Sequence, residues 1–101
     1  MIRHRQNMVG AAVCKWRMAR GYTQEQLAAK CQIKGWDISR ATLSKIEARI
    51  RCVSDAEVML LASVLKCSHA DLLGADLKEA LEVAQTSRPS ELKKVSRRTR
   101  K

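Results

Sequence analysis

The chain has 101 residues, with 20 Lys or Arg against 10 Asp or Glu, so its formal charge at pH 7 is +10. This length predicts one small domain, and four glycines with one proline are too few turn-forming residues for a β-sandwich or barrel. No apolar run approaches the ~20 residues that cross a bilayer, and no apolar segment of a secretion signal follows the basic N-terminus, so we expect neither a transmembrane span nor a signal peptide. A basic chain of this size is expected to bind a polyanion, and charge alone does not distinguish DNA, RNA and an anionic membrane surface.

Helical periodicity begins near the N-terminus. Apolar residues at helical spacing predict a first helix, with Ala12 and Ala19 beside the stripe made by Val9, Val13 and Trp16. Gly21 is expected to end this helix. Thr23 should cap a second helix, and Gln26, three residues later, completes the pattern of a capping box.

A loop over residues 32–38 separates the second helix from a third, for which Ser39 is the expected cap and Leu43 and Ile46 the inward positions. A basic connector spans residues 49–53. Ser54 and Glu57 form the pattern of another capping box and open a fourth helix. Ser68 should cap a fifth helix that stops at Gly74, and a weak periodicity suggests a sixth: Leu77, Leu81 and Ala84. Because no β-type alternation occurs, the fold class is all-α.

The positive charge is concentrated at the C-terminus. Residues 87–101 hold seven basic residues and one acidic residue, with only two large aliphatic side chains. Such a segment buries too little apolar surface to offset its ordering entropy, so we expect a disordered basic tail that adds affinity for polyanions without reading sequence. The predicted organisation is a helical domain at 7–74, a possible C-terminal helix at 75–86 and the tail at 87–101.

The four cysteines show no metal-ligand spacing, and neither does His4 or His69. We therefore expect no metal, no cofactor and no catalytic residues, and an enzyme is disfavoured because no activating motif or glycine-rich phosphate loop occurs. The simplest interpretation makes the cysteines small buried hydrophobic residues in a reducing compartment. A redox sensor at Cys52, within the basic connector, is the alternative.

Several segments in order carry a family resemblance. The stretch from Arg17 to Ala28 (RMARGYTQEQLA) resembles the first half of the Cro/repressor-type, or XRE-family, helix-turn-helix, and residues 38–47 (ISRATLSKIE) resemble the second half. Residues 61–65 and 70–73 are similar to the closing helices of that family. The resemblance, over residues 8–74, implies a five-helix lambda-repressor-like domain.

The join between the two motif helices departs from the family pattern. It is several residues longer than usual, and Gln32 stands where the family usually has glycine. Trp36 in this lengthened turn either folds back onto the neighbouring helices or contacts DNA or a second protomer. Lys66 replaces a frequent glycine after the fourth helix.

The resemblance also implies roles for individual residues. The outward side of the third helix would meet DNA bases through Arg40, Ala41, Ser44 and Lys45. Phosphate contacts are expected from Gln24, Thr42, Lys34, Arg49 and Arg51. Arg17 and Glu47 resemble an internal ion pair of the family and are interpreted as structural. The alternative for the remaining residues is a solvated surface, and for Thr42 a bond within its own helix.

The implied function is a sequence-specific regulator of transcription that binds double-stranded DNA in the cytoplasm, in association with the nucleoid. We expect a homodimer that acts by occupying a promoter or operator, since two half-sites enlarge a small reading surface. An antitoxin-type regulator with a protein partner is a close variant. An RNA- or ribosome-associated helix-turn-helix protein is the other alternative, although the chain lacks the aromatics that stack on single-stranded RNA.

Overall fold

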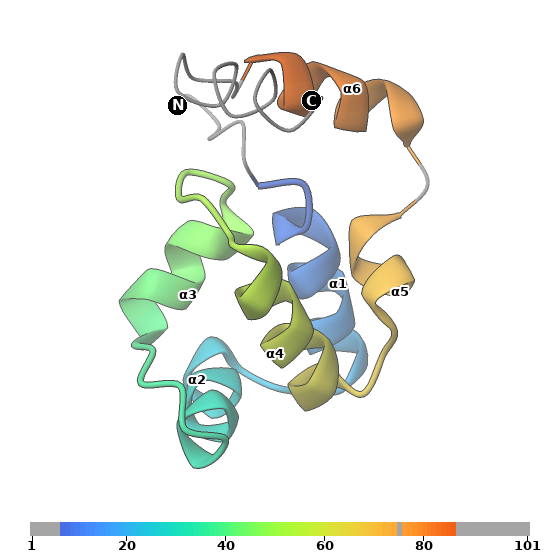
Figure 1. The fold of residues 1–101 in the computed structure, drawn as a ribbon. Coiled ribbons are helices and arrows are strands. Elements are labelled where there is room, and N and C mark those ends of the chain that lie inside the picture. Colours follow the sequence, from blue (N-terminus) through green and yellow to red (C-terminus); the bar gives the residue numbers. More distant parts are fainter. Residues whose placement is uncertain (1–6, 75, 87–101) are drawn as a thin grey trace, which may run out of the picture.

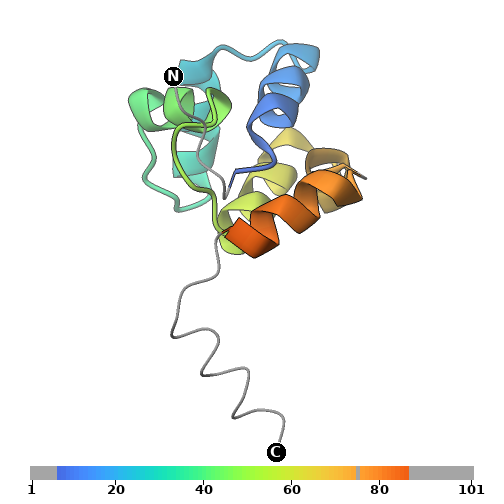
Figure 2. The same cartoon turned by 90° about the horizontal axis from the view of Figure 1, so that it is seen from above.

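The computed structural model describes residues 7–74 and 76–86, and every regular element in these ranges is a helix (Figures 1 and 2). This confirms the all-α prediction. The helices are α1 (Gly10–Ala19), α2 (Gln24–Ile33), α3 (Arg40–Glu47), α4 (Asp55–Leu65), α5 (His69–Leu73) and α6 (Leu77–Thr86). The predicted tail at 87–101 lies outside the described residues.

The helix starts follow the predicted capping chemistry. The side chains of Thr23 and Ser54 each accept a hydrogen bond from the backbone N–H three residues later. The side chains of Gln26 and Glu57 in turn accept from the backbone N–H of Thr23 and Ser54, so both predicted capping boxes are present. Ser39 and Ser68 cap α3 and α5 in the same way. These side chains satisfy N–H groups that have no partner inside the helix, which is why the sequence locates four of the six starts.

The end of α4 places a lysine in a conformation that favours glycine. Lys66 has φ 57° and ψ 49°, the left-handed region. The carbonyls of Leu65 and Lys66 accept hydrogen bonds from Arg20 at 2.8 Å each, so a cation also neutralises this helix terminus. By contrast, α1 ends as predicted with a glycine, Gly21, at φ 76°.

Lys66→Gly is expected to raise the free energy of unfolding by about 0.5–1 kcal/mol, because a left-handed residue with a Cβ atom costs on the order of 1–2 kcal/mol. Lys34→Gly is the matched control, since Lys34 ends α2 with φ −78° and glycine there should be neutral or destabilising. Urea unfolding of both variants measures the difference. Equal shifts in the two midpoints would contradict this explanation.

The hydrophobic core lies between α1, α2, α3, α4 and α5. Its fully buried side chains include those of Val13, Leu27, Leu43, Ile46, Leu61, Leu65 and Leu72. Both inward positions predicted for the third helix are among them. The sixth helix lies outside this core (Figure 1), and its Leu77 and Leu81 are 82% and 58% exposed.

A buried asparagine joins the start of α1 to the end of α3, which the sequence analysis did not anticipate. Asn7 is fully buried, its Nδ2 donates to the carbonyls of Ile46 (2.8 Å) and Arg51 (2.9 Å), and its Oδ1 accepts from the Gly10 N–H. A Cβ atom on Gly10 would lie 2.3 Å from the Ile46 carbonyl oxygen. Glycine here therefore permits the close approach of α1 and α3.

The lengthened turn is anchored to the domain at several points. Ile38 is buried, Trp36 packs against the core, and the Gln32 Nε2 donates to the Ile38 carbonyl at 2.8 Å. The positive φ that the turn needs is supplied by Gly35, at φ 99°, rather than at position 32. The packing of Trp36 agrees with the first of its two interpretations.

The prediction that the four cysteines are buried is wrong in part. Cys31 is buried, and desolvation raises the pKa of its thiol to about 11. Cys14 and Cys67 are half-buried, and Cys52 is exposed. Cys52 is exposed because the connector before α4 runs over the surface of the domain, away from the hydrophobic core.

Candidate nucleic-acid interface

The exposed side of α3 carries the residues predicted to meet DNA bases. Arg40, Ala41 and Lys45 are exposed and Ser44 is half-buried, whereas Leu43 and Ile46 point into the core. We call these four outward residues the recognition surface. It contains two cations and no acidic group. In Figure 1, α3 lies at the outer edge of the domain.

The first turn of α3 is fixed by its cap. The Ser39 hydroxyl accepts from the Thr42 N–H and donates to the Thr42 Oγ1, both at 3.1 Å. The Thr42 hydroxyl thus accepts from the cap residue, and its own proton remains available to an acceptor. The cap orients the turn that presents Arg40 and Ala41.

Three polar side chains connect α1, α2 and α3, namely those of Arg17, Gln24 and Glu47. The Arg17 Nε donates to the Glu47 Oε2 at 2.7 Å, and the Arg17 Nη2 donates to the Oε1 at 3.0 Å. The side chains are only 14% and 6% exposed, respectively. This forked hydrogen bonding to Glu47 raises the pKa of Arg17 above its usual value. The ion pair that the resemblance implied is therefore present and ties α3 to α1.

Gln24 also contacts this carboxylate. Its Nε2 donates to the Glu47 Oε1 at 3.0 Å, so the side-chain amide donor points inward rather than toward a phosphate. The Thr23 hydroxyl accepts from the Gln26 N–H at the same helix terminus. The side chain of Gln24 therefore connects the start of α2 to the end of α3.

The other residues predicted to contact phosphate differ in their availability. Lys34 is exposed at the end of α2. Arg49 forms an ion pair with Glu79 of α6, and Arg51 forms one with Glu57 of α4 at 2.9 Å. The sequence analysis missed both acidic partners. Glu57 was identified only as a capping residue, and Glu79 is 30 residues from Arg49.

The Arg51–Glu57 pair makes stability depend on pH. Hydrogen bonding from Arg51 lowers the pKa of Glu57 below its usual value of about 4.5. A carboxylate with a lowered pKa in the folded state stabilises above its unfolded pKa, and this contribution is lost as the pH falls through the folded one. Glu57→Gln should therefore reduce the free energy of unfolding at pH 7 by about 0.5–1 kcal/mol, and the deficit should close as the pH falls through the lowered pKa of the folded state. Chemical unfolding from pH 7 to pH 3 tests this, and a deficit independent of pH would contradict it.

The described residues show no metal site and no membrane span. They place no group of three or more His, Cys, Asp or Glu together in a way that could hold a metal ion. Among the helices in the described ranges, none has the length and apolar character to cross a bilayer.

Comparison with known proteins identifies the family. The family model described as helix-turn-helix matches residues 15–72, more than half of the chain, from within α1 to α5. No curated protein and no solved structure matches the chain. The match spans both motif helices, the lengthened turn between them and the α4–α5 support, and it agrees with the earlier resemblance. The chain belongs to the Cro/repressor-type, XRE-like family of helix-turn-helix proteins, which are DNA-binding regulators.

Proposed function

We propose that this protein is a sequence-specific regulator that binds double-stranded DNA as a homodimer and acts by occupying a promoter or operator. The observation that carries the proposal is the recognition surface on α3, which is basic and exposed within a domain of a DNA-binding family. The major groove of B-DNA is about 12 Å wide and admits one helix, whose first residues meet the base edges.

The side chains of the recognition surface suit direct contacts with bases. Arg40, in the first turn, can donate two hydrogen bonds to guanine O6 and N7, and Ala41 can touch a thymine methyl group. Ser44 and Lys45, one turn later, can donate to acceptors deeper along the groove. The Arg17–Glu47 ion pair supports the proposal, because it holds the helix that presents these residues.

Phosphate contacts are proposed for the rim of this surface. Lys34, which is exposed, and Thr42 are proposed to contribute, together with the start of α2. Arg49 and Arg51 remain candidates, although each is paired with an acidic residue of another helix. Such contacts position the protein on the duplex and carry no sequence information.

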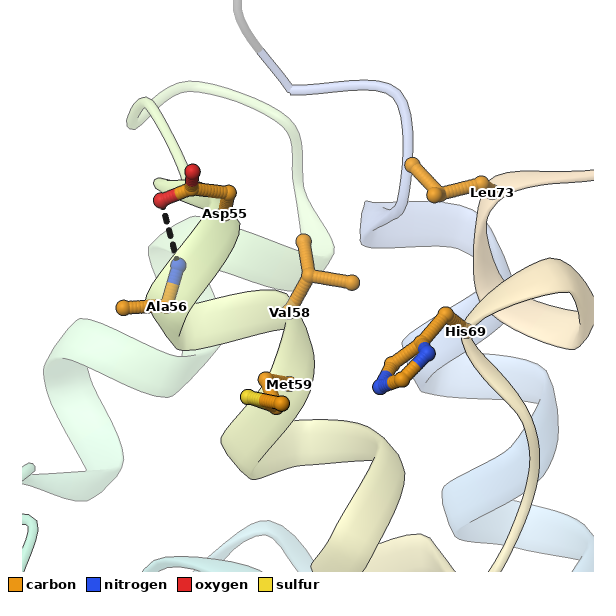
Figure 3. Close-up of a pocket in the computed structure, with 6 residues that line it drawn as sticks. All are labelled: Asp55, Ala56, Val58, Met59, His69 and Leu73. Atoms are coloured by element: carbon orange, nitrogen blue, oxygen red, sulfur yellow. Dashed lines mark hydrogen bonds between the residues drawn. The ribbon is translucent and has the colours of Figure 1, made fainter.

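An apolar groove between α4 and α5 supports the dimer. It has a volume of about 540 Å³ and is lined by Asp55, Ala56, Val58, Met59, His69 and Leu73 (Figure 3). Met59 and Leu73 are exposed. The groove belongs to helices other than α2 and α3. A second copy of the chain bound there would therefore leave the recognition surface of each protomer free. Two-fold symmetry would then favour a palindromic site.

Selection of bound sequences from random duplex DNA tests the proposed function. We expect two related half-sites, with centres about 10–10.5 base pairs or a multiple of that distance apart. Structured RNA should compete poorly with the selected duplex. Absence of any enriched sequence, or stronger competition by RNA than by DNA, would overturn the proposal and favour the RNA-associated alternative.

A further inference from the structure

Arg49 lies two residues after the end of α3 and has a positive backbone φ. Its φ is 63°, in the left-handed region. The Nε donates to the Asn7 carbonyl at 2.8 Å, and the Nη2 pairs with the Glu79 carboxylate. The side chain is 19% exposed. A cation next to the proposed DNA-binding helix is thus held by an acid from the last helix of the described chain.

The last helix is acidic in a strongly basic protein. Residues 76–86 contain one basic and three acidic side chains, whereas the whole chain carries +10. Glu79, Ala80 and Val83 are half-buried, while Leu77 and Leu81 are exposed. Val83 and the core residue Val9 both line a groove of about 470 Å³ between this helix and the domain. The Arg49–Glu79 pair is one charged contact that joins the helix to the segment after α3.

We propose that Glu79 competes with a DNA phosphate for Arg49, so that α6 lowers the affinity of the protein for duplex DNA. Glu79 is a positioning residue, since it acts on DNA binding through Arg49 and does not itself touch DNA. The inference rests on the proposed function, because it needs a duplex bound at α3.

The exchange is physically accessible because the two anions are alternatives for one guanidinium. The guanidinium of Arg49 carries a fork of N–H donors that fits either a carboxylate or a phosphate. While Glu79 is paired, its negative charge also repels an approaching phosphate. Partly exposed ion pairs contribute little to stability in general, so a phosphate can displace the carboxylate.

The carboxylate of Glu57, the partner of Arg51, is held more firmly than that of Glu79. Glu57 accepts hydrogen bonds from Arg51 and, as part of the α4 capping box, from the Ser54 N–H. This second bond holds the carboxylate in place at the start of a core helix. Glu79 instead sits on the peripheral α6, so of the two arginines Arg49 is the one that can change partner.

The test compares Glu79→Gln with Glu82→Gln in the full chain. Both substitutions remove one negative charge from α6, but only the first removes the partner of Arg49. Affinity for a duplex without a selected site is measured at several salt concentrations. We expect Glu79→Gln to bind about two- to fivefold more tightly than Glu82→Gln, with a salt slope steeper by up to ~0.9, which corresponds to one added phosphate contact.

The same pair of substitutions in an Arg49→Gln background should show no difference. A purely structural role of Glu79 would shift the melting temperature without steepening the salt slope. Equal affinities and slopes for Glu79→Gln and Glu82→Gln, with wild-type protein binding DNA, would overturn this inference alone. Failure of the wild-type protein to bind any duplex would overturn the proposed function and the inference with it. The two single variants decide the matter even if Arg49→Gln does not fold.

Discussion

Replacing Glu47 with Ala should lower the free energy of unfolding by about 3–5 kcal/mol, the largest effect expected of any substitution considered for this chain. The Glu47 carboxylate accepts two hydrogen bonds from Arg17 and one from Gln24, and its side chain is only 6% exposed. Its removal leaves the Arg17 guanidinium largely buried without an anion. For a domain of this size the melting temperature should fall by at least about 12 °C.

Glu57→Ala provides the matched control. It also removes an arginine partner, but Arg51 is 31% exposed and can return to water. The additional loss of the capping-box bond limits the expected cost to about 1–2 kcal/mol. Thermal and urea unfolding of both variants would measure the contrast. Similar losses for Glu47→Ala and Glu57→Ala would show that burial does not decide the strength of these pairs.

Arg40→Ala should leave stability nearly unchanged and weaken binding to the best duplex by about 1–3 kcal/mol, roughly five- to 150-fold. Arg40 is exposed in the first turn of α3, where a substitution rarely costs more than about 0.5 kcal/mol. If its guanidinium reads a guanine, preference should relax at one base pair of each half-site. Binding measurements on the selected site and on single-base variants would show this pattern.

Lys15→Ala is the control for charge alone, since Lys15 is an exposed cation on α1. It should weaken all duplexes slightly and equally. The competing outcome for Arg40→Ala is a uniform loss on every sequence. That result would make Arg40 a phosphate contact and transfer base reading to Ser44 and Lys45.

The sequence predicts those parts of the fold that depend on local chemistry. Thr23, Ser39, Ser54 and Ser68 cap their helices as expected, because a cap needs only a side-chain oxygen and an N–H three residues away. The inward positions of α3 follow in the same way from helical spacing. The family resemblance also predicted the order of the helices and the Arg17–Glu47 pair.

Apart from the Arg17–Glu47 pair, interactions between distant residues could not be predicted. Asn7 binds carbonyls 39 and 44 residues away, and nothing in its neighbourhood marks it as buried. The rotamer of Gln24 is similarly hidden, since the resemblance suggests the residue type but not which way its amide points. Arg49 and Arg51 lie in the expected places, but their acidic partners belong to other helices. The composition of the candidate site was thus predictable, and the availability of its charges was not.

The junction of Asn7 and Gly10 with the end of α3 has a consequence for where the domain begins. The family match starts at residue 15, in the middle of α1. A fragment trimmed to that boundary would lose the first half of α1 and the side chain that binds the Ile46 and Arg51 carbonyls. The same fragment would also lack the buried core side chains of Val9 and Val13. The cooperative unit of this protein therefore includes Asn7, which lies eight residues before the segment by which the family is detected.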